Sequence, residues 1–324
     1  MPDSRLPPHA CWKLCRDDPG FRLDDVYSPK ARIGSGHRIV TAGSCFAQNI
    51  SRYLARSNLS LLDVEPAPSA MPEEVARQFG FGLYSARYGN IYTARQLLQL
   101  VRDTVAGQVH DAAIWERDGR YFDALRPGVE PEGLSSPEEV RAHREDHLAR
   151  VAGLLRQMDV LIFTLGLTEA WEDRETGLVF PSAPGVIAGS HDPDRHRFVN
   201  YSFGEVMADM EEALDLLCEA APNLRVILTV SPVPLTATAA GGHVLSATTY
   251  SKSVLRAVAG ELAYRREEVD YFPAYEIVAG LPFGPANFEP NLRSVSHAAV
   301  ERVMRIFFAA HGLELGLEDA PTPQ

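Results

Sequence analysis

The 324-residue chain has few cysteines, no long apolar run and no excess of basic residues. Its four cysteines, Cys11, Cys15, Cys45 and Cys218, are too few and too scattered for a disulfide framework. No second cysteine pair completes a zinc site with Cys11 and Cys15. No apolar stretch approaches the roughly 20 residues needed to span a bilayer, and the N-terminus lacks the apolar core of a signal peptide. We therefore expect a cytoplasmic protein with no membrane partner.

The net charge of −12 at pH 7 argues against a general nucleic-acid or anionic-membrane binder, because such proteins are normally basic. A hydrophobic content of 45% with 23% charged residues is typical of a globular protein with a sizeable core. No internal repeat or linker divides the chain. We expect an irregular N-terminal arm over residues 1–37, one domain over 38–311 and a disordered tail over 312–324, with no nucleic-acid partner, metal or cofactor.

The stretch from Arg38 to Leu54 has the pattern of a strand, a turn and a helix, and it contains the candidate nucleophiles. Residues 39–42 are apolar or β-branched, as in a buried strand, and the pattern becomes helical after Gly43 and Ser44. A strand, a sharp turn and a helix place a side chain at the edge of a sheet and at a positive helix N-terminus. Ser44 is therefore a candidate nucleophile, although a serine here can also simply cap the helix. Cys45 is the rival nucleophile, because a helix N-terminus favours a thiolate.

Buried strands alternate with amphipathic helices along the rest of the chain. Strand patterns occur at 59–64, 159–165, 224–230 and 269–272. Helical patterns occur at 94–105, 137–157, 202–220, 250–266 and 295–310. The alternation predicts an α/β fold, a three-layer α/β/α sandwich with a mainly parallel sheet. Ligands of such sheets bind at the carboxyl ends of the strands, where Ser44, Gly166 and Ser231 fall.

Other segments have weaker signals. Asp118-Gly119 predicts a hairpin within residues 112–125, and residues 174–180 suggest a smaller one. Residues 181–201 read as one long loop, a length that is often functional. His143 and His147 lie four residues apart on the charged helix 137–157, which favours a solvated helix face.

The run Gly43-Ser44-Cys45-Phe46-Ala47 resembles the signature that names the GSCFA family. Further blocks match in order: GNIYT from Gly89, TLGLTEAW from Thr164, TVSPVPLTAT from Thr229, YSKSVLRAVAGEL from Tyr250 and YFPAYEIV from Tyr271. The family is related to the SGNH/GDSL hydrolases, whose first block is also a strand ending in Gly-x-Ser or Gly-Asp-Ser. The resemblance implies the flavodoxin-like SGNH fold and a serine-dependent esterase or O-acyltransferase. Its substrate would be an acylated small molecule or glycan, in keeping with the family's association with polysaccharide modification.

The resemblance also implies roles for single residues, with Ser44 as the nucleophile. Oxyanion donors would be the Cys45 backbone N–H, a glycine N–H from the loop 82–90, and a side chain after Gly166. Thr168 stands where the SGNH Gly-x-Asn-Asp block has its asparagine, and the Asn90 amide is an alternative to it or only a turn residue. The predicted oxyanion and substrate-binding residues are Cys45, Gly82, Gly89, Asn90, Gly166, Thr168, Glu169 and Ser231.

Two histidines are candidates for the general base, and the sequence does not decide between them. Many members of the family end in an Asp-x-x-His-Pro-Ser pattern, whose aspartate and histidine fall here on Asn291 and Ser294. His297 lies one helical turn further on and is slightly favoured by chain order. His191 matches the histidine of the family's Cys-His-Lys motif and has two aspartates nearby. If neither serves, the protein is a non-catalytic binding or accessory protein of polysaccharide metabolism that keeps the fold.

Overall fold

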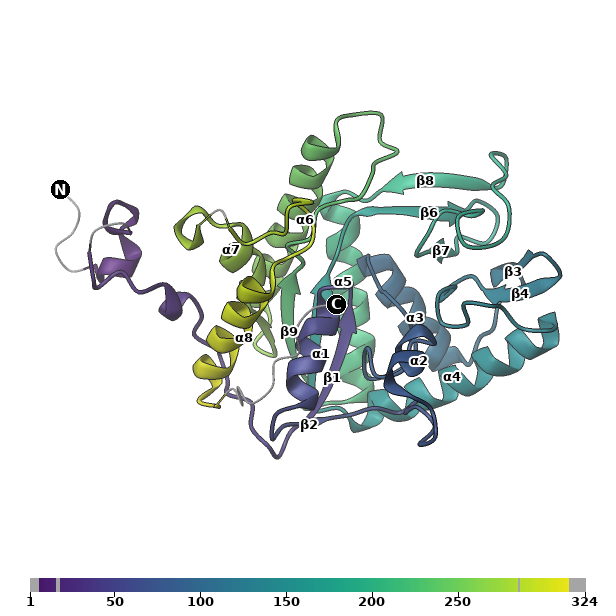
Figure 1. Ribbon diagram of the computed structural model, residues 1–324, viewed down its shortest axis with the longest axis horizontal. Coiled ribbons are helices and arrows are strands. Elements are labelled where there is room, and N and C mark those ends of the chain that lie inside the picture. Colours follow the sequence, from purple (N-terminus) through teal and green to yellow (C-terminus); the bar gives the residue numbers. More distant parts are fainter. Residues whose placement is uncertain (1–5, 16–17, 285, 315–324) are drawn as a thin grey trace.

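A five-stranded parallel sheet forms the centre of the protein (Figure 1). The computed structural model describes residues 6–15, 18–284 and 286–314. The strands are β1 (Arg38–Gly43), β2 (Ser60–Leu61), β5 (Val160–Leu165), β9 (Arg225–Val230) and β10 (Val269–Tyr271). Their order is β10-β9-β5-β1-β2, which is the 2-1-3-4-5 order of flavodoxin-like sheets. The predicted α/β fold with a mainly parallel sheet is confirmed.

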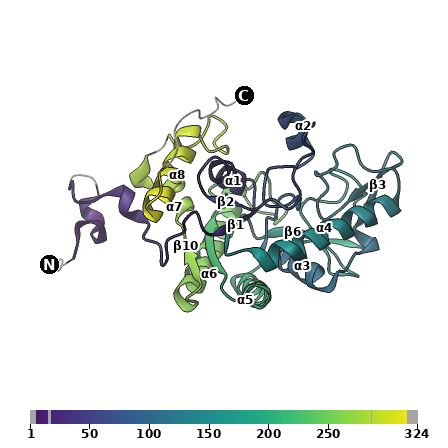
Figure 2. The ribbon, with the colours of Figure 1, turned by 90° about the horizontal axis from the view of Figure 1, so that it is seen from below.

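Helices cover both faces of the sheet and give the predicted three layers (Figure 2). One layer contains α1 (Ala47–Ala55), α7 (Ala274–Ala279) and α8 (His297–His311). The other contains α3 (Ala94–Ala106), α4 (Pro137–Gln157), α5 (Phe203–Ala220) and α6 (Val244–Arg265). Successive residues of β5 alternate between the two cores, since Ile162 packs with the first layer and Phe163 with the second. A strand with two buried faces explains the unbroken apolar run of its sequence.

The strand register brings three chain segments to one edge of the sheet. Gly43 pairs with Thr164, and Leu165 pairs with Val230, so β1, β5 and β9 end side by side. The residues that follow these strands are Ser44, Gly166 and Ser231. The sequence-based expectation that they meet at the carboxyl edge is therefore met by the register.

Two small antiparallel sheets stand beside the sandwich. The hairpin of β3 (Ile114–Arg117) and β4 (Arg120–Asp123) turns at Asp118 and Gly119, with φ of 53° and 73°, as their sequence predicts. The other sheet, in the order β7-β6-β8, joins β6 (Glu169–Asp173), β7 (Val179–Phe180) and β8 (His196–Asn200). The prediction of a continuous loop over 181–201 is wrong at its end, because the polar β8 pairs along β6 as an edge strand.

Element boundaries differ from the sequence patterns at several points. Helix α6 begins at Val244 instead of Tyr250, because His243 caps it by accepting the Leu245 N–H. A short helix that the sequence did not predict, α2, spans Glu73–Gln78. Within the described ranges, no helix is both long and apolar enough to cross a membrane.

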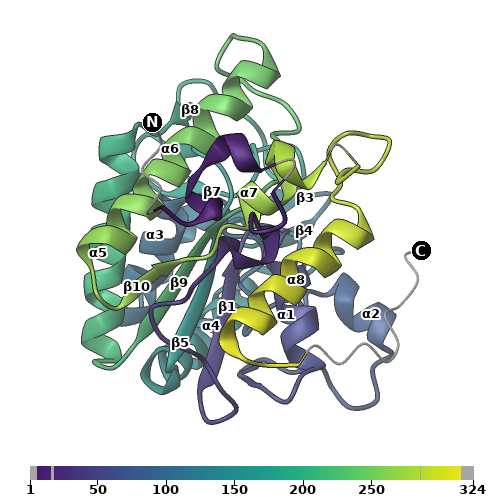
Figure 3. The ribbon, with the colours of Figure 1, turned by 90° about the vertical axis from the view of Figure 1, so that its left-hand side faces the viewer.

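The N-terminal arm is irregular and contains three 3-10 turns, Pro8–Ala10, Trp12–Leu14 and Leu23–Val26 (Figure 3). It docks through Tyr27, which is buried and donates a hydrogen bond of 3.0 Å from its hydroxyl to Asp270 on β10. Trp12 is 68% exposed and does not share in this docking. At the other end Gly312 closes α8 in a left-handed conformation, and the predicted tail falls largely on residues 315–324, outside the described part.

The interpretation of the α4 histidines as a solvated face is wrong for His147. His143 is exposed, but His147 is fully buried and its Nδ1 lies 2.7 Å from Glu65 Oε2. Glu65 also accepts the Arg87 backbone N–H at 2.6 Å and lies 3.8 Å from the Arg126 guanidinium. The partner stands 82 residues earlier, so the helix pattern by itself could not reveal the pair.

Acidification below pH 6.5 is expected to destabilise the fold through His147. Burial and the nearby charges of Arg126 and Arg144 lower the pKa of His147 to about 4, against the opposing effect of Glu65. The unfolded chain therefore binds more protons between pH 6.5 and 4, so stability is full above pH 6.5 and falls as pH falls through 4. Calorimetric melting at several pH values should show a flatter profile for His147→Gln, which keeps a donor for Glu65. His143→Gln, at an exposed site on α4, should leave the profile unchanged, and an unchanged profile for both variants would contradict the assignment.

Candidate functional site

The turn after β1 is fixed by a close approach of two strands. Gly43 has a φ of +132°, and a Cβ at this position would lie 2.4 Å from the Thr164 carbonyl oxygen. The Ser44 backbone N–H donates to the same oxygen at 3.1 Å, and the Ser44 carbonyl accepts the Ala47 N–H at 2.8 Å. Only glycine fits here, and the chain then enters α1 directly.

Ser44 and Cys45 have opposite surroundings. Ser44 is 2% exposed, and its hydroxyl has no hydrogen-bond partner among the described residues. It does not cap α1, which has no side-chain cap. From Thr41 to Ala47 every residue is buried except Cys45, which is partly exposed. In this structure Cys45 as a residue is partly accessible to solvent, whereas Ser44 is buried.

Gly166 packs directly on the turn. A Cβ on Gly166 would lie 2.9 Å from Ser44 Cβ and 2.9 Å from the Tyr92 carbonyl oxygen. That oxygen accepts the N–H groups of Gly166 and Leu167, both at 3.0 Å. The Ile91 N–H donates to the Gly43 carbonyl at 2.9 Å, which joins the glycine-rich loop to the same edge. The structure thus brings together the three segments that the sequence predicted.

Lys252 is the residue that the sequence-based analysis missed. It is 2% exposed, and its Nζ donates to the Gly166 carbonyl at 2.5 Å. Burial lowers the pKa of Lys252 to about 7, and the charge of Cys45 acts in the opposite direction. Its signal in the sequence is its position, because Lys252 lies on the buried face of α6 with Leu255 and Ala259.

The predicted donors after Gly166 are engaged elsewhere. The Thr168 hydroxyl donates to Asn200 Oδ1 at 2.6 Å, and its N–H donates to Ser251 Oγ at 2.9 Å. Glu169 accepts the Thr238 hydroxyl at 2.7 Å, and Ser231 Oγ accepts the Val233 N–H at 3.3 Å. In this structure the hydrogen bonds of these residues connect β6 to β8 and to the segments that follow β9.

Asn90 lies beside the turn, in a small polar network. The Tyr84 hydroxyl lies 2.5 Å from Asn90 Oδ1 and 3.1 Å from the Ser44 carbonyl oxygen. The Gln48 amide donates to both Asn90 Oδ1 and the Tyr84 oxygen at 3.3 Å. A cavity of about 180 Å³ opens here. Its walls include Gln48, Tyr84, Gly89, Asn90, Tyr92 and Ser182, whereas the exposed Gly82 lies outside them.

Neither histidine lies within hydrogen-bonding distance of the Ser44 hydroxyl. His297 is the exposed first residue of α8. His191 is also exposed, and its ring packs against Trp171 and His196, with centroids 5.1 Å and 6.0 Å away. His196 pairs with Asp173, at the opposite end of β6 from Glu169, so this contact is distant from the turn.

The loop before α8 bears no acid–base pair. Asn291 Nδ2 donates to Ser294 Oγ at 2.9 Å in an exposed turn, so these two side chains bind each other. Burial raises the pKa of Tyr92 and lowers that of Lys252, and the charge of Arg293 in this loop opposes the first shift and adds to the second. Among the residues with described placement, no group of three or more metal-ligating side chains occurs.

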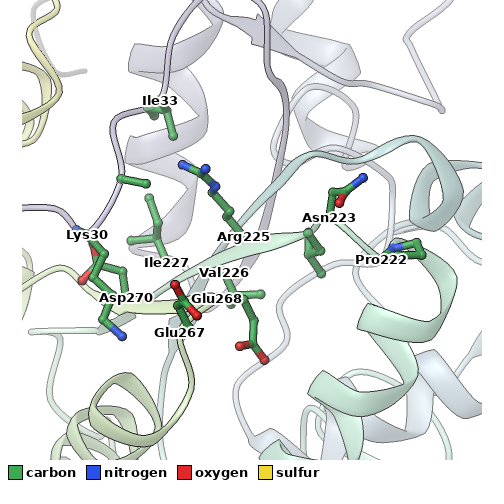
Figure 4. A pocket seen from close by; sticks show the side chains of 12 residues that line it. Lys30, Ile33, Pro222, Asn223, Arg225, Val226, Ile227, Glu267, Glu268 and Asp270 are labelled. Atoms are coloured by element: carbon green, nitrogen blue, oxygen red, sulfur yellow. The ribbon is translucent and has the colours of Figure 1, made fainter.

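A larger cavity, of about 840 Å³, lies at the opposite edge of the sheet (Figure 4). It is lined by the arm and by the amino ends of β9 and β10, including Lys30, Arg225, Glu268 and Asp270. Ligands of parallel sheets bind at the carboxyl ends, and the residues that line this cavity include no serine or cysteine. The smaller site at the turn is therefore the better functional candidate despite its size.

The model of the GSCFA family matches residues 38–307. The chain belongs to the GSCFA family. The match begins at the first residue of β1 and ends within α8, so it spans the sandwich and leaves the arm outside. The motif that gives this GSCFA family its name, residues 43–47, runs from the last residue of β1 to the first residue of α1. No curated protein matches the chain.

Proposed function

We propose that this GSCFA protein is an esterase or O-acyltransferase that acts on an acylated small molecule or glycan. The covalent nucleophile would lie in the turn from Gly43 to Cys45. The observation that carries the proposal is the meeting, at the carboxyl edge of the sheet, of this turn with the buried amine of Lys252. Acyl transfer needs a nucleophile, a proton acceptor and donors for the oxyanion.

Each of these requirements has a candidate at the turn. Ser44 is the nucleophile that the resemblance favours, and Cys45 is its rival. The Cys45 backbone N–H donates to no acceptor within the described ranges, so it is free to stabilise an oxyanion. Asn90 and Gln48 place side-chain amides in the wall of the adjoining cavity, where they can bind a polar substrate group.

Replacing both candidates together tests the reaction class without choosing between them. The double variant Ser44→Ala, Cys45→Ala should hydrolyse a short activated ester, such as p-nitrophenyl acetate, at the rate of buffer alone. Its melting temperature should stay close to that of the wild type, since Ser44 Oγ makes no hydrogen bond that the change could remove. A double variant as active as the wild type would show that the nucleophile lies outside the turn.

A second candidate function is a binding or accessory role in polysaccharide metabolism. The observation that favours it is the unpartnered Ser44 hydroxyl, together with the Asn291 and Ser294 side chains that bind each other. Under this proposal the wild type is inert to esters and to fluorophosphonate, but binds an oligosaccharide with a saturable calorimetric signal. Ester turnover that depends on the turn would exclude it as the main function.

A further inference from the structure

We infer that Cys45, and not Ser44, is the nucleophile of this site, and that the buried Lys252 is its charge partner and proton acceptor. The inference rests on the proposed acyl-transfer function and names the groups that perform it. It follows from the accessibility of the two residues and from the position of Lys252.

Accessibility separates the two candidates most clearly. An attacking atom must reach a carbonyl carbon at about 3–3.5 Å, which requires a path from solvent or from a cavity. Ser44 lies beneath Gly166, whose Cβ position is 2.9 Å from Ser44 Cβ, and it is 2% exposed. Cys45 is the partly exposed residue in an otherwise buried run from Thr41 to Ala47. Of the two candidates, Cys45 is therefore the one that solvent, and hence a substrate, reaches in this structure.

Lys252 is held beside the turn that carries the thiol, because it binds the carbonyl of Gly166, and Gly166 packs on Ser44. Its Nζ makes one hydrogen bond to a described residue, to the Gly166 carbonyl, which leaves N–H groups free. The Cys45 charge opposes the effect of burial on the pKa of Lys252, and it adds to burial in raising the pKa values of Tyr84 and Tyr92. The turn with the thiol, the amine of Lys252 and the loop that contains Tyr92 therefore meet at Gly166, whose N–H donates to the Tyr92 carbonyl at 3.0 Å.

The protonation state of Lys252 suits a proton acceptor. Burial lowers its pKa to about 7, and Arg293 lowers it further, while the Cys45 charge raises it. A lysine with a pKa near the working pH is partly present as the neutral amine, which is the form that can accept a proton. Proton transfer then yields a thiolate beside an ammonium, and their attraction stabilises both charges.

The reaction can be written with all atoms accounted for. The Lys252 amine takes the thiol proton, and the thiolate sulfur attacks the ester carbonyl carbon to form a C–S bond. The ester C–O bond breaks, and the leaving alcohol takes the proton from the Lys252 ammonium. Water or an acceptor hydroxyl then attacks the thioester, its proton passes to Lys252, and the C–S bond breaks. The products are the acid or the new ester, and the free thiol is restored when the proton returns.

Alkylation kinetics test the charged pair directly. Iodoacetamide should modify Cys45 at pH 7 at least 10-fold faster than Cys218, which is also partly exposed but has its pKa raised by burial. Lys252→Met should remove that advantage and leave Cys218 unchanged. Its melting temperature should not fall, because an apolar residue of similar volume replaces a buried charge. Lys252→Arg, which retains a cation, should restore part of the Cys45 rate if it folds.

Two results would contradict the pairing of Cys45 with Lys252. One is a Cys45 alkylation rate no higher than that of Cys218. The other is a Cys45 rate in folded Lys252→Met that equals the wild-type rate. Single variants then separate the inference from the proposed function. Cys45→Ala should lose ester hydrolysis by about 10²-fold or more, and Ser44→Ala should retain it. The reverse pattern would overturn the inference and leave the proposed function standing. A fast, Lys252-dependent thiol in a protein that turns over no ester would overturn the proposed function, and with it Cys45 as an acyl-transfer nucleophile.

Discussion

Replacing Gly43 with alanine is expected to destabilise the protein by roughly 2–5 kcal/mol. The backbone at Gly43 has a φ of +132°, which an L-residue with a side chain rarely adopts. The new Cβ would lie 2.4 Å from the Thr164 carbonyl oxygen, and that oxygen belongs to the backbone of a buried strand. The strain cannot be relieved by a side-chain rotation, so β1 and β5 must separate at the site. Urea denaturation measures the loss.

Gly36→Ala is the matched control for this change. Gly36 lies just before β1, it has no heavy atom within 4 Å of its Cβ position, and it is exposed. Its replacement should change the free energy of unfolding by less than about 1 kcal/mol in either direction. Equal effects of the two substitutions would contradict the close approach of Gly43 to Thr164. Because Gly43 begins the turn that positions Cys45, the Gly43 variant should also lose ester hydrolysis before it unfolds.

Replacing Glu65 with alanine should cost about 3–5 kcal/mol, since it breaks a buried ion pair with Arg126 and removes the acceptor of two further hydrogen bonds. Glu65 is 8% exposed and accepts hydrogen bonds from the His147 ring and the Arg87 backbone N–H. Arg126, 5% exposed, would also lose a nearby negative charge. Chemical denaturation of the variant and the wild type at pH 7 measures this cost.

Glu212→Ala provides the comparison for Glu65. Glu212 also pairs with an arginine, Arg102, at 2.6 Å, but both side chains are about half exposed. Solvent screens such a pair, so its loss should cost at most about 1 kcal/mol. A Glu65 variant that loses no more stability than the Glu212 variant would show that burial does not strengthen the Glu65 cluster.

The sandwich could be predicted from the sequence because its signals are local. The β5 run from Val160 to Leu165 is apolar on both faces, which marks it as a buried parallel strand. Thr93 caps α3 in a full capping box with Gln96, and Gly312 ends α8. Strand β8 could not be predicted in the same way, because a polar edge strand takes its structure from its partner.

The site could be predicted only in part. The turn and its neighbour Gly166 follow from strand ends that meet at one edge, which sequence alone indicates. In the Gly-x-Ser block of the SGNH hydrolases the serine lies two residues after the glycine. The residue two positions after Gly43 in this chain is Cys45, so this spacing places Cys45 at the position of that serine. Lys252 was missed because a single lysine on an amphipathic helix usually faces solvent. Its contact with the Gly166 carbonyl joins residues 86 positions apart, and only the fold reveals it.

Covalent capture of the acyl group tests the central claim most directly. The wild type is mixed briefly with p-nitrophenyl acetate, quenched in acid, and mapped by peptide mass spectrometry. Our account predicts one acetyl group per chain on the peptide that contains Cys45, removed by neutral hydroxylamine as a thioester is. The label should be absent from Cys45→Ala and retained in Ser44→Ala. An acetyl group on Ser44 would contradict the assignment of the thiol, and no acetyl group in the turn from Gly43 to Cys45 would contradict the account as a whole.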